Sequence, residues 1–224
     1  SSDNLLVVLE DPDLGWYKKD VAKSIIDEAS AIGIKTKLMP ISGPTNKANN
    51  DLARIMKKYE CTLFFARIGD QDRFGSNSCK SKRVMSYVRN NQDLASAFGT
   101  VNYKALNELK KNIDELMLNS HTISIRCPNG TDVTSKLVNL DVRKISDVNI
   151  RRFPVVVPMP ITARHTSGKV VLEGFLTPTG SKVYTPPSIP IETRVEVFIK
   201  NGRIDYFQGA LRTIEKINSH YDRV

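Results

Sequence analysis

The sequence has few of the residue types that usually perform chemistry or hold metal ions. It contains three cysteines, three histidines and one tryptophan in 224 residues. The cysteines are an odd number without CxxC spacing, which favours reduced thiols in a cytoplasmic setting over a disulfide framework. The histidines His121, His165 and His220 lie far apart, so their spacing identifies neither a catalytic triad nor a facial triad of metal ligands.

Long hydrophobic runs and nucleotide-binding motifs are also missing. No apolar run approaches the roughly 18 to 20 residues that cross a bilayer, so we expect no membrane span. The first residues, SSDNLLVVLEDPD, have neither a basic region nor a cleavage site and do not predict a signal peptide. Neither GxGxxG nor GxxxxGK[ST] occurs, so no nucleotide cofactor is expected.

Positive charge, in contrast, is in excess. Lysine and arginine together number 33 against 24 acidic residues, which gives a net charge of +9 and suggests acidic partners. The basic residues are spread along the chain, and they are densest at 79–83, 110–111 and 151–152. They are not interleaved with aromatic residues, so nucleic acid is not the expected partner. A peptide or small molecule with an acidic group suits this charge better.

The first half of the chain alternates short apolar strands with helices. We expect strands at 5–10, 34–39 and 61–68, and helices at 17–32, 49–59, 81–90 and 103–118. The first of these helices places an apolar face on one side, formed by Val21, Ile25, Ile26, Ala29 and Ile32. The alternation predicts an α/β domain with a doubly wound parallel sheet.

The second half is typical of antiparallel strands joined by tight turns. The segment 121–128 alternates like a strand, NGTD predicts a hairpin, and further strands are expected at 169–176, 190–200 and 204–209. Asn-Gly at 201–202 predicts the last hairpin, and 210–221 a short helix. We therefore expect a Rossmann-like α/β domain over residues 1–120 and a smaller, β-rich (α+β) domain with a short C-terminal helix over 121–224.

In a doubly wound sheet, ligands bind beyond the carboxyl ends of the strands. Loops 11–16, 40–47 and 67–77 are expected along this rim, and the last of them is the richest in charge. Its aspartates are more typical of turns than of metal ligands. Arginine forks suit a carboxylate. The predicted ligand-binding residues are Arg67, Asp70, Arg73, Arg151, Arg152 and His165.

The segment FPVVVPMPITARHTSGKVVLEG, which starts at Phe153, resembles the wall of an active site. From Phe153 to Thr166 it contains no carboxylate and no cysteine, and His165 is its one histidine. A loop of this composition can contact a ligand, but it offers no general acid and no set of metal ligands. We therefore predict no catalytic residue and no metal site.

The second half resembles a known group of metalloenzymes. RCPNGTDVTSKL (126–137) and VEVFIKNGRIDYFQG (195–209) are similar to segments of thermophilic-type leucyl aminopeptidases and of their relative 2,5-dihydroxypyridine dioxygenase. In the peptidases, the loop that matches 153–158 carries a glutamate that binds metal, but here it reads FPVVVP. In both groups, further ligands lie beyond the point that matches Gly209. The resemblance therefore implies a shortened member without the metal-ligand segments.

Three hypotheses follow. The expected one is a non-catalytic binding protein. It takes a peptide or small ligand either in the cleft between its domains or at a strand edge. Presentation of a substrate in a biosynthetic pathway is one role that such a protein could have. The alternative is a metal-dependent enzyme, an aminopeptidase or a ring-opening dioxygenase, of which this sequence is a part. The third is an assembly module that forms a homodimer through its β-rich half.

Overall fold

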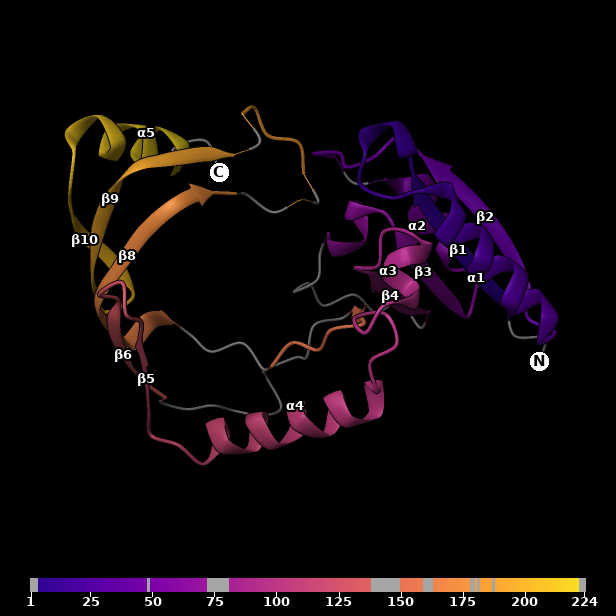
Figure 1. Cartoon of the computed structure of the whole chain (residues 1–224), viewed down its shortest axis with the longest axis horizontal. Coiled ribbons are helices and arrows are strands. Elements are labelled where there is room, and N and C mark those ends of the chain that lie inside the picture. Colours follow the sequence, from indigo (N-terminus) through magenta and orange to yellow (C-terminus); the bar gives the residue numbers. More distant parts are fainter. Residues whose placement is uncertain are drawn as a thin grey trace. The chain divides into compact units, whose positions relative to one another are not determined.

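The first apolar run of the chain lies inside a parallel sheet. This computed structural model describes residues 4–47, 49–71, 81–137, 150–158, 163–177, 180, 182–186 and 188–221. Strand β1 (Asn4–Glu10) lies between β2 (Lys35–Ile41) and β3 (Cys61–Phe65). The sheet continues in the order β2-β1-β3-β4-β7, and every pair in it is parallel (Figure 1).

Both faces of this sheet are covered, as a doubly wound fold requires. Along β1, Leu6 and Val8 pack on the side of helix α2 (Asn50–Met56), while Val7 and Leu9 pack on the side of helix α1 (Lys19–Ala31). Alternate side chains of a strand point to opposite faces, so a continuous apolar run such as LLVVL fits a strand buried on both sides. The prediction of a doubly wound α/β fold is confirmed.

The predicted helix at 81–90 is wrong. Residues 82–86 form strand β4 (Lys82–Ser86), which pairs in parallel with β3, with Val84 beside Leu63 and Met85 beside Phe64. A short apolar run fits a buried strand as well as a helix, and here its pairing alongside β3 decides between them. The helix that follows β4 is the short α3 (Asn91–Ala95), and the helix expected at 103–118 is present as α4 (Tyr103–Leu118).

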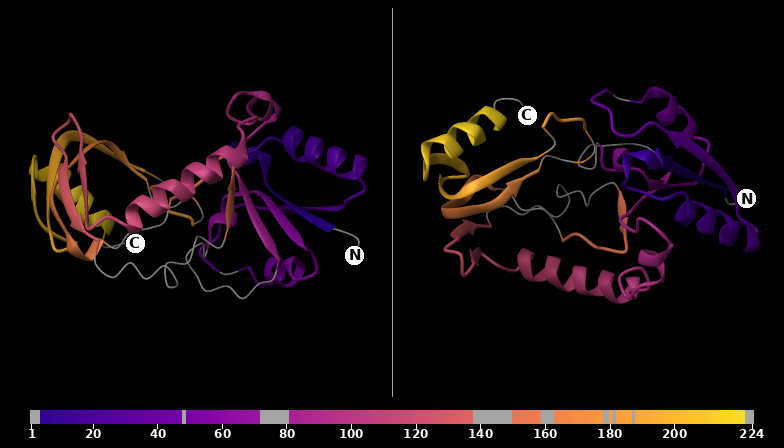
Figure 2. Two further views of the ribbon diagram at one scale, coloured as in Figure 1. Left: turned by 90° about the horizontal axis from the view of Figure 1, so that it is seen from below. Right: turned by 45° about the horizontal axis from the view of Figure 1, so that its top comes forward.

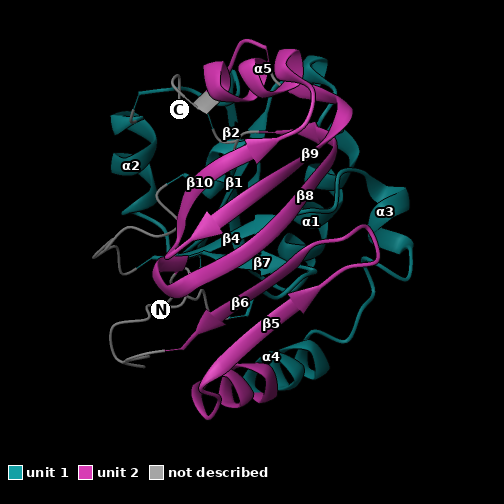
Figure 3. Cartoon of the chain, turned by 90° about the vertical axis from the view of Figure 1, so that its left-hand side faces the viewer, with its two compact units in different colours: residues 1–111, 146–158, 179–183 teal, residues 112–145, 159–178, 184–224 magenta. Residues whose placement is uncertain are grey.

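The chain divides into two compact units, which Figure 3 colours separately. Unit 1 consists of residues 1–111, 146–158 and 179–183, and unit 2 of residues 112–145, 159–178 and 184–224. The division differs from the expected boundary at residue 120, because the chain returns to unit 1 after entering unit 2. Strand β7 (Arg151–Phe153) makes this return and pairs with β4.

Unit 2 contains an antiparallel sheet in the order β10-β9-β8-β6-β5 (Figure 3). Its strands are β5 (Thr122–Arg126), β6 (Asp132–Lys136), β8 (Thr166–Leu176), β9 (Ile189–Lys200) and β10 (Arg203–Gln208). Helix α5 (Leu211–Tyr221), yellow in Figure 2, lies beside this sheet. Its Ile217 packs against Val195 and Val197 of β9. A second, β-rich unit is therefore confirmed.

The hairpin predicted from Asn-Gly forms as expected. Asn201 and Gly202 both have positive φ, 51° and 74°, and they connect β9 to β10. Positive φ at both central residues matches the right-handed twist of the flanking strands, which is why Asn-Gly is favoured there. The NGTD hairpin also forms, between β5 and β6.

The apolar face predicted for α1 is wrong at one position. Ile32 follows the helix end and is exposed. Among the described cysteines, Cys127 is exposed and Cys61 is half-buried, and burial raises the pKa of the Cys61 thiol. Cys79 lies outside the described residues. None of the helices that the structure describes has the length and apolar character needed to cross a bilayer.

Candidate ligand-binding site

The connections of the unit 1 sheet change direction at β1. From β1 the chain goes to β2 on one side and later to β3 on the other, so the carboxyl ends of β1 and β3 form a topological switch point. Two charged residues meet there. Glu10, the last residue of β1, is 0% exposed and accepts a hydrogen bond from the backbone N–H of Arg67 (2.9 Å). The Arg67 Nε donates to both Glu10 oxygens, at 3.0 and 3.2 Å.

A tryptophan ring next to this pair contacts two arginines. The Arg67 guanidinium is 4.6 Å from the centre of the Trp16 ring, and the Arg89 guanidinium is 4.7 Å from it. Trp16 is in the loop after β1, and Arg89 is in the loop after β4, so residues distant in sequence meet at the carboxyl edge. Contacts of this kind stabilise the guanidinium over the ring face. The Trp16 side chain is still 39% exposed, so a ligand can reach it.

Asp70 connects this edge to the last strand of the sheet. It lies in the 3₁₀ helix η2 (Arg67–Asp70), and its carboxylate accepts from the Tyr87 hydroxyl at 3.2 Å and from Arg152 Nη2 at 3.4 Å. The carboxylate is therefore held by a phenol and a guanidinium. The sequence pattern predicts that the aspartates of this loop form turns, whereas the Asp70 side chain accepts hydrogen bonds from Tyr87 and Arg152.

The structure thus gathers only some of the predicted residues. Arg67, Asp70 and Arg152 lie at the carboxyl edge of the unit 1 sheet, and Arg151 lies beside Arg152 on β7. His165 belongs to unit 2, where it ends the 3₁₀ helix η3 (Ala163–His165) and is exposed. Arg73 lies outside the described residues.

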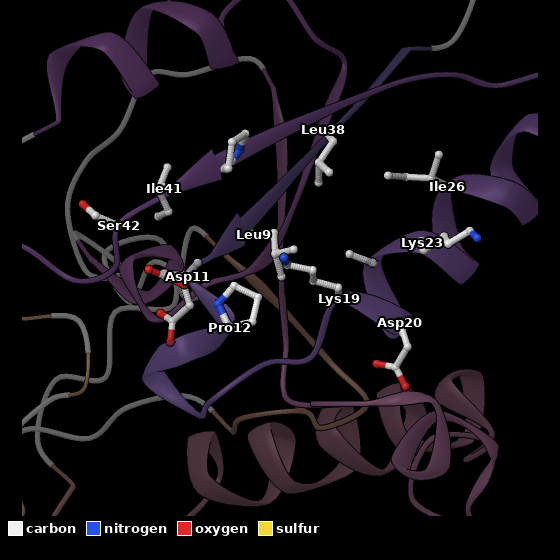
Figure 4. Close-up of a pocket in the computed structure, with 13 residues that line it drawn as sticks. Leu9, Asp11, Pro12, Lys19, Asp20, Lys23, Ile26, Leu38, Ile41 and Ser42 are labelled. Atoms are coloured by element: carbon white, nitrogen blue, oxygen red, sulfur yellow. The ribbon is translucent and has the colours of Figure 1, made fainter.

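A hollow of about 750 Å³ adjoins the switch point. Its lining includes Leu9, Ile26 and Leu38, whose side chains face the same space between β1, α1 and β2 in Figure 4. Charged residues of the loop after β1 and of α1 also line it: Asp11, Lys19, Asp20 and Lys23. Glu10 lines this hollow and also binds Arg67, so the hollow and the arginine–tryptophan cluster share a residue.

Tyr17 supports the loop that carries Trp16. It is buried, and its hydroxyl donates a 2.7 Å hydrogen bond to the backbone carbonyl of Ser86 at the end of β4. Burial raises the pKa of the Tyr17 phenol well above its ordinary value of 10.0. The Glu10 carboxylate raises this pKa further, while Arg89 lowers it. The neutral phenol is therefore the form that the fold requires.

Replacing Tyr17 should reveal this requirement. Tyr17→Phe leaves the Ser86 carbonyl buried without its donor, so we expect the free energy of unfolding to fall by about 1–2 kcal/mol in urea titrations at pH 7. The raised pKa adds a pH dependence. Its stabilising contribution is complete below pH 10.0, the ordinary value, and is lost above it, because the unfolded phenol ionises first.

The control for this prediction is the half-exposed Tyr206→Phe in unit 2. Above pH 10.0 the wild type and Tyr206→Phe should lose stability more steeply than Tyr17→Phe does. If the free energy of unfolding fell equally steeply with pH in all three proteins, the role assigned to the buried Tyr17 phenol would be contradicted.

Sequence reasoning missed four residues of the site: Glu10, Trp16, Tyr17 and Arg89. Glu10 had a usable signal, because an acidic residue ends an otherwise apolar strand that was placed inside the sheet. Trp16 is the single tryptophan of the chain, and it stands in a loop that had been placed on the rim. Arg89 could not be found, since residues 81–90 were expected to be helical.

No family model and no curated protein matches the chain. A solved structure that is similar to it is that of a 2,5-dihydroxypyridine dioxygenase from Pseudomonas putida KT2440, with a TM-score of 0.59 and 11% sequence identity. The two proteins share a fold. The match covers 97% of this chain and 65% of that dioxygenase, so this chain spans less than two thirds of the longer protein.

At this identity the likeness concerns the fold alone, and it supports a distant structural relationship to the dioxygenase rather than to leucyl aminopeptidases. Among the described residues, no group of three or more His, Cys, Asp or Glu side chains is placed to hold a metal ion.

Proposed function

We propose that this chain is a non-catalytic binding protein that takes a peptide or small molecule with an apolar part and a carboxylate. The binding site is the carboxyl edge of the unit 1 sheet. The observation that carries the proposal is the position of the Arg67 and Arg89 guanidinium groups over Trp16 at the switch point. A binding role on an aminopeptidase-like scaffold, presentation of a biosynthetic substrate and assembly as a homodimer are finer parts of the same proposal.

The two arginines have different tasks. Arg67 is held by the buried Glu10 carboxylate, so its charge is already compensated and it mainly fixes the Trp16 ring. Arg89 is exposed and forms no salt bridge with a residue that the structure describes. Contact with the ring limits the orientations of its guanidinium. A guanidinium held in this way loses less conformational entropy than a freely rotating one when two of its N–H groups donate to a carboxylate.

The hollow next to this cluster accepts the apolar part of the ligand. Its volume of about 750 Å³ lies within the range of roughly 300–1,000 Å³ that is usual for small-molecule sites. Leu9, Ile26 and Leu38 give it an apolar floor. Its charged lining residues are the carboxylates Glu10, Asp11 and Asp20 and the lysines Lys19 and Lys23, so the excess positive charge for the ligand comes from Arg89 and not from the hollow. A ligand that fills the hollow with a hydrophobic side chain and extends its carboxylate toward Arg89 uses both features.

A calorimetric titration with paired peptides tests the proposal. Short peptides with a hydrophobic C-terminal residue should bind as free acids, and the same peptides with an amidated C-terminus should bind about tenfold or more weakly. Arg89→Gln should weaken binding of the acids by a similar factor. Arg54→Gln is the matched control, because it removes an exposed arginine of the same unit whose pair with Asp51 is 75% and 79% exposed.

Equal affinity for acids and amides, or no binding of either, would overturn the proposal. A second candidate, a metal-dependent enzyme, is favoured by the fold likeness to the dioxygenase. Stoichiometric iron, zinc or cobalt in the purified chain, together with higher stability on addition of that metal, would favour this alternative over a passive binder.

A further inference from the structure

A second hollow, of about 400 Å³, lies beside edge strand β7 in unit 1. We propose that this hollow binds the phosphoryl group of a phosphate monoester. We call it the basic hollow, and it is lined by Tyr103, Asn107, Lys110, Lys111, Ile150, Arg151, Arg152, Val155, Val156 and Val157. The proposal goes beyond the carboxylate site at Trp16 and does not depend on it.

The polar groups of the basic hollow come from one side of a helix and from one strand. Tyr103, Asn107, Lys110 and Lys111 are spaced at i, i+4, i+7 and i+8 in α4, which puts them on the same helix face. Arg151 and Arg152 come from β7. Among the lining residues that the structure describes, four are cationic and none is a carboxylate. Such a surface attracts an anion with more than one negative charge.

The side chain of Arg152 gives a second observation that points to a bound anion, besides the charge of the lining. Its side chain is only 10% exposed, and its contact with Asp70 Oδ1, made through Nη2, is a long one at 3.4 Å. Its Nε is buried and has no hydrogen-bond partner among the residues that the structure describes. A buried N–H without an acceptor destabilises a fold, so such groups call for an explanation. An anionic oxygen in the basic hollow supplies the acceptor.

The other charges at the site are compatible with an incoming anion. Lys111 pairs with Glu108 at 2.6 Å, but both side chains are largely exposed, at 64% and 65%. Exposed pairs of this kind contribute little, so Lys111 can turn toward a ligand at low cost. Asp70 contacts Arg152 but is not one of the residues that line the hollow. The described lining residues therefore keep an excess of positive charge.

Size and composition indicate an ester rather than a free phosphate ion. A phosphate ion fills only part of 400 Å³, since a water molecule occupies roughly 30 Å³ in the liquid. The side chains of Val155, Val156 and Val157 give the hollow an apolar wall for the organic part. A phosphate monoester carries a charge of about −1.5 to −2 at pH 7 and three acceptor oxygens, which suits several cationic donors.

Thermal unfolding and calorimetry of the full chain test this site with inorganic phosphate and phenyl phosphate as probes. Both probes should raise Tm relative to sodium chloride of equal ionic strength, and phenyl phosphate, whose organic part is apolar, should bind more tightly than phosphate. Arg151→Gln and Lys111→Gln should each weaken binding about tenfold. Lys104→Gln, which removes an exposed charge of the same helix outside the basic hollow, should bind as the wild type does.

The outcomes separate this site from the carboxylate site. Arg89→Gln should leave phosphate binding unchanged, even if it abolishes carboxylate binding. A response to phosphate that equals the response to chloride, or that is the same in Arg151→Gln, Lys111→Gln and the wild type, would overturn the proposal. Loss of phosphate binding in Arg89→Gln alone would also overturn it, because the anion would then bind at Trp16.

Discussion

Glu10→Ala should lower the free energy of unfolding by about 3 kcal/mol, measured by urea titration at pH 7. The Glu10 side chain is fully buried and accepts three hydrogen bonds from Arg67, two of them charged. Removing the carboxylate leaves the guanidinium without its counter-charge. The loss should lie near the lower end of the range for buried pairs, because the Arg67 side chain is 18% exposed and also contacts Trp16.

The matched control for Glu10→Ala is Asp51→Ala. Asp51 forms a salt bridge with Arg54 of the same length, 3.0 Å, but both side chains are exposed. We expect its removal to change the free energy of unfolding by less than about 0.5 kcal/mol. If the two substitutions had similar effects, burial of the Glu10–Arg67 pair would not be the feature that stabilises the switch point.

Gly168→Ala should destabilise unit 2 by about 2–3 kcal/mol. Gly168 is in β8 with a φ of +132°, and a Cβ at this position would lie 2.3 Å from the backbone oxygen of Asp132 and 2.8 Å from the Cα of Val133. These are backbone atoms of the paired strand β6, so the strands would have to move apart. The expected loss is measured as a lower urea midpoint, or as faster hydrogen exchange in β6 and β8.

Gly174→Ala is the control that measures the cost of backbone strain without a close contact to another strand. Gly174 is in the same strand with a φ of +82°, but an added Cβ would meet nothing within 4 Å. Its substitution should therefore cost only the strain of a positive φ, about 1 kcal/mol. A loss for Gly168→Ala no larger than that for Gly174→Ala would contradict the tight contact between β6 and β8.

Local patterns were sufficient to predict most elements of the fold. The helix at 103–118 has the predicted bounds, because its apolar residues keep helical spacing over four turns. The hairpin at 201–202 followed from Asn-Gly, whose residues tolerate the positive φ that the turn needs. In both cases, the information lies within one short stretch of sequence.

Predictions failed where a distant strand decides the structure. Residues 82–86 are a strand because they add to β3, and 151–153 are a strand because they add to β4. Neither segment is long enough for its own periodicity to show this. The expected domain boundary at residue 120 differs from the structure for the same reason, since β7 returns the chain to the first sheet.

The candidate site was predictable only in outline. The rule for doubly wound sheets placed the loops after β1 and β3 at one edge, and Arg67 and Asp70 lie there. The contact of Arg89 with Trp16 depends on β4, which was not expected, and so no sequence argument could join these two residues. Charge alone suggested an acidic ligand, while the hollow and the exposed indole came from the structure.

The fluorescence of Trp16 tests the central claim most directly, because this residue is the only tryptophan of the chain and lies in the proposed site. Addition of a peptide acid with a hydrophobic C-terminal residue should change the emission in a saturable way. The midpoint should agree with calorimetry and should shift about tenfold higher in Arg89→Gln. Calorimetric binding with an unchanged Trp16 emission would place the ligand elsewhere and contradict a carboxylate site at the switch point.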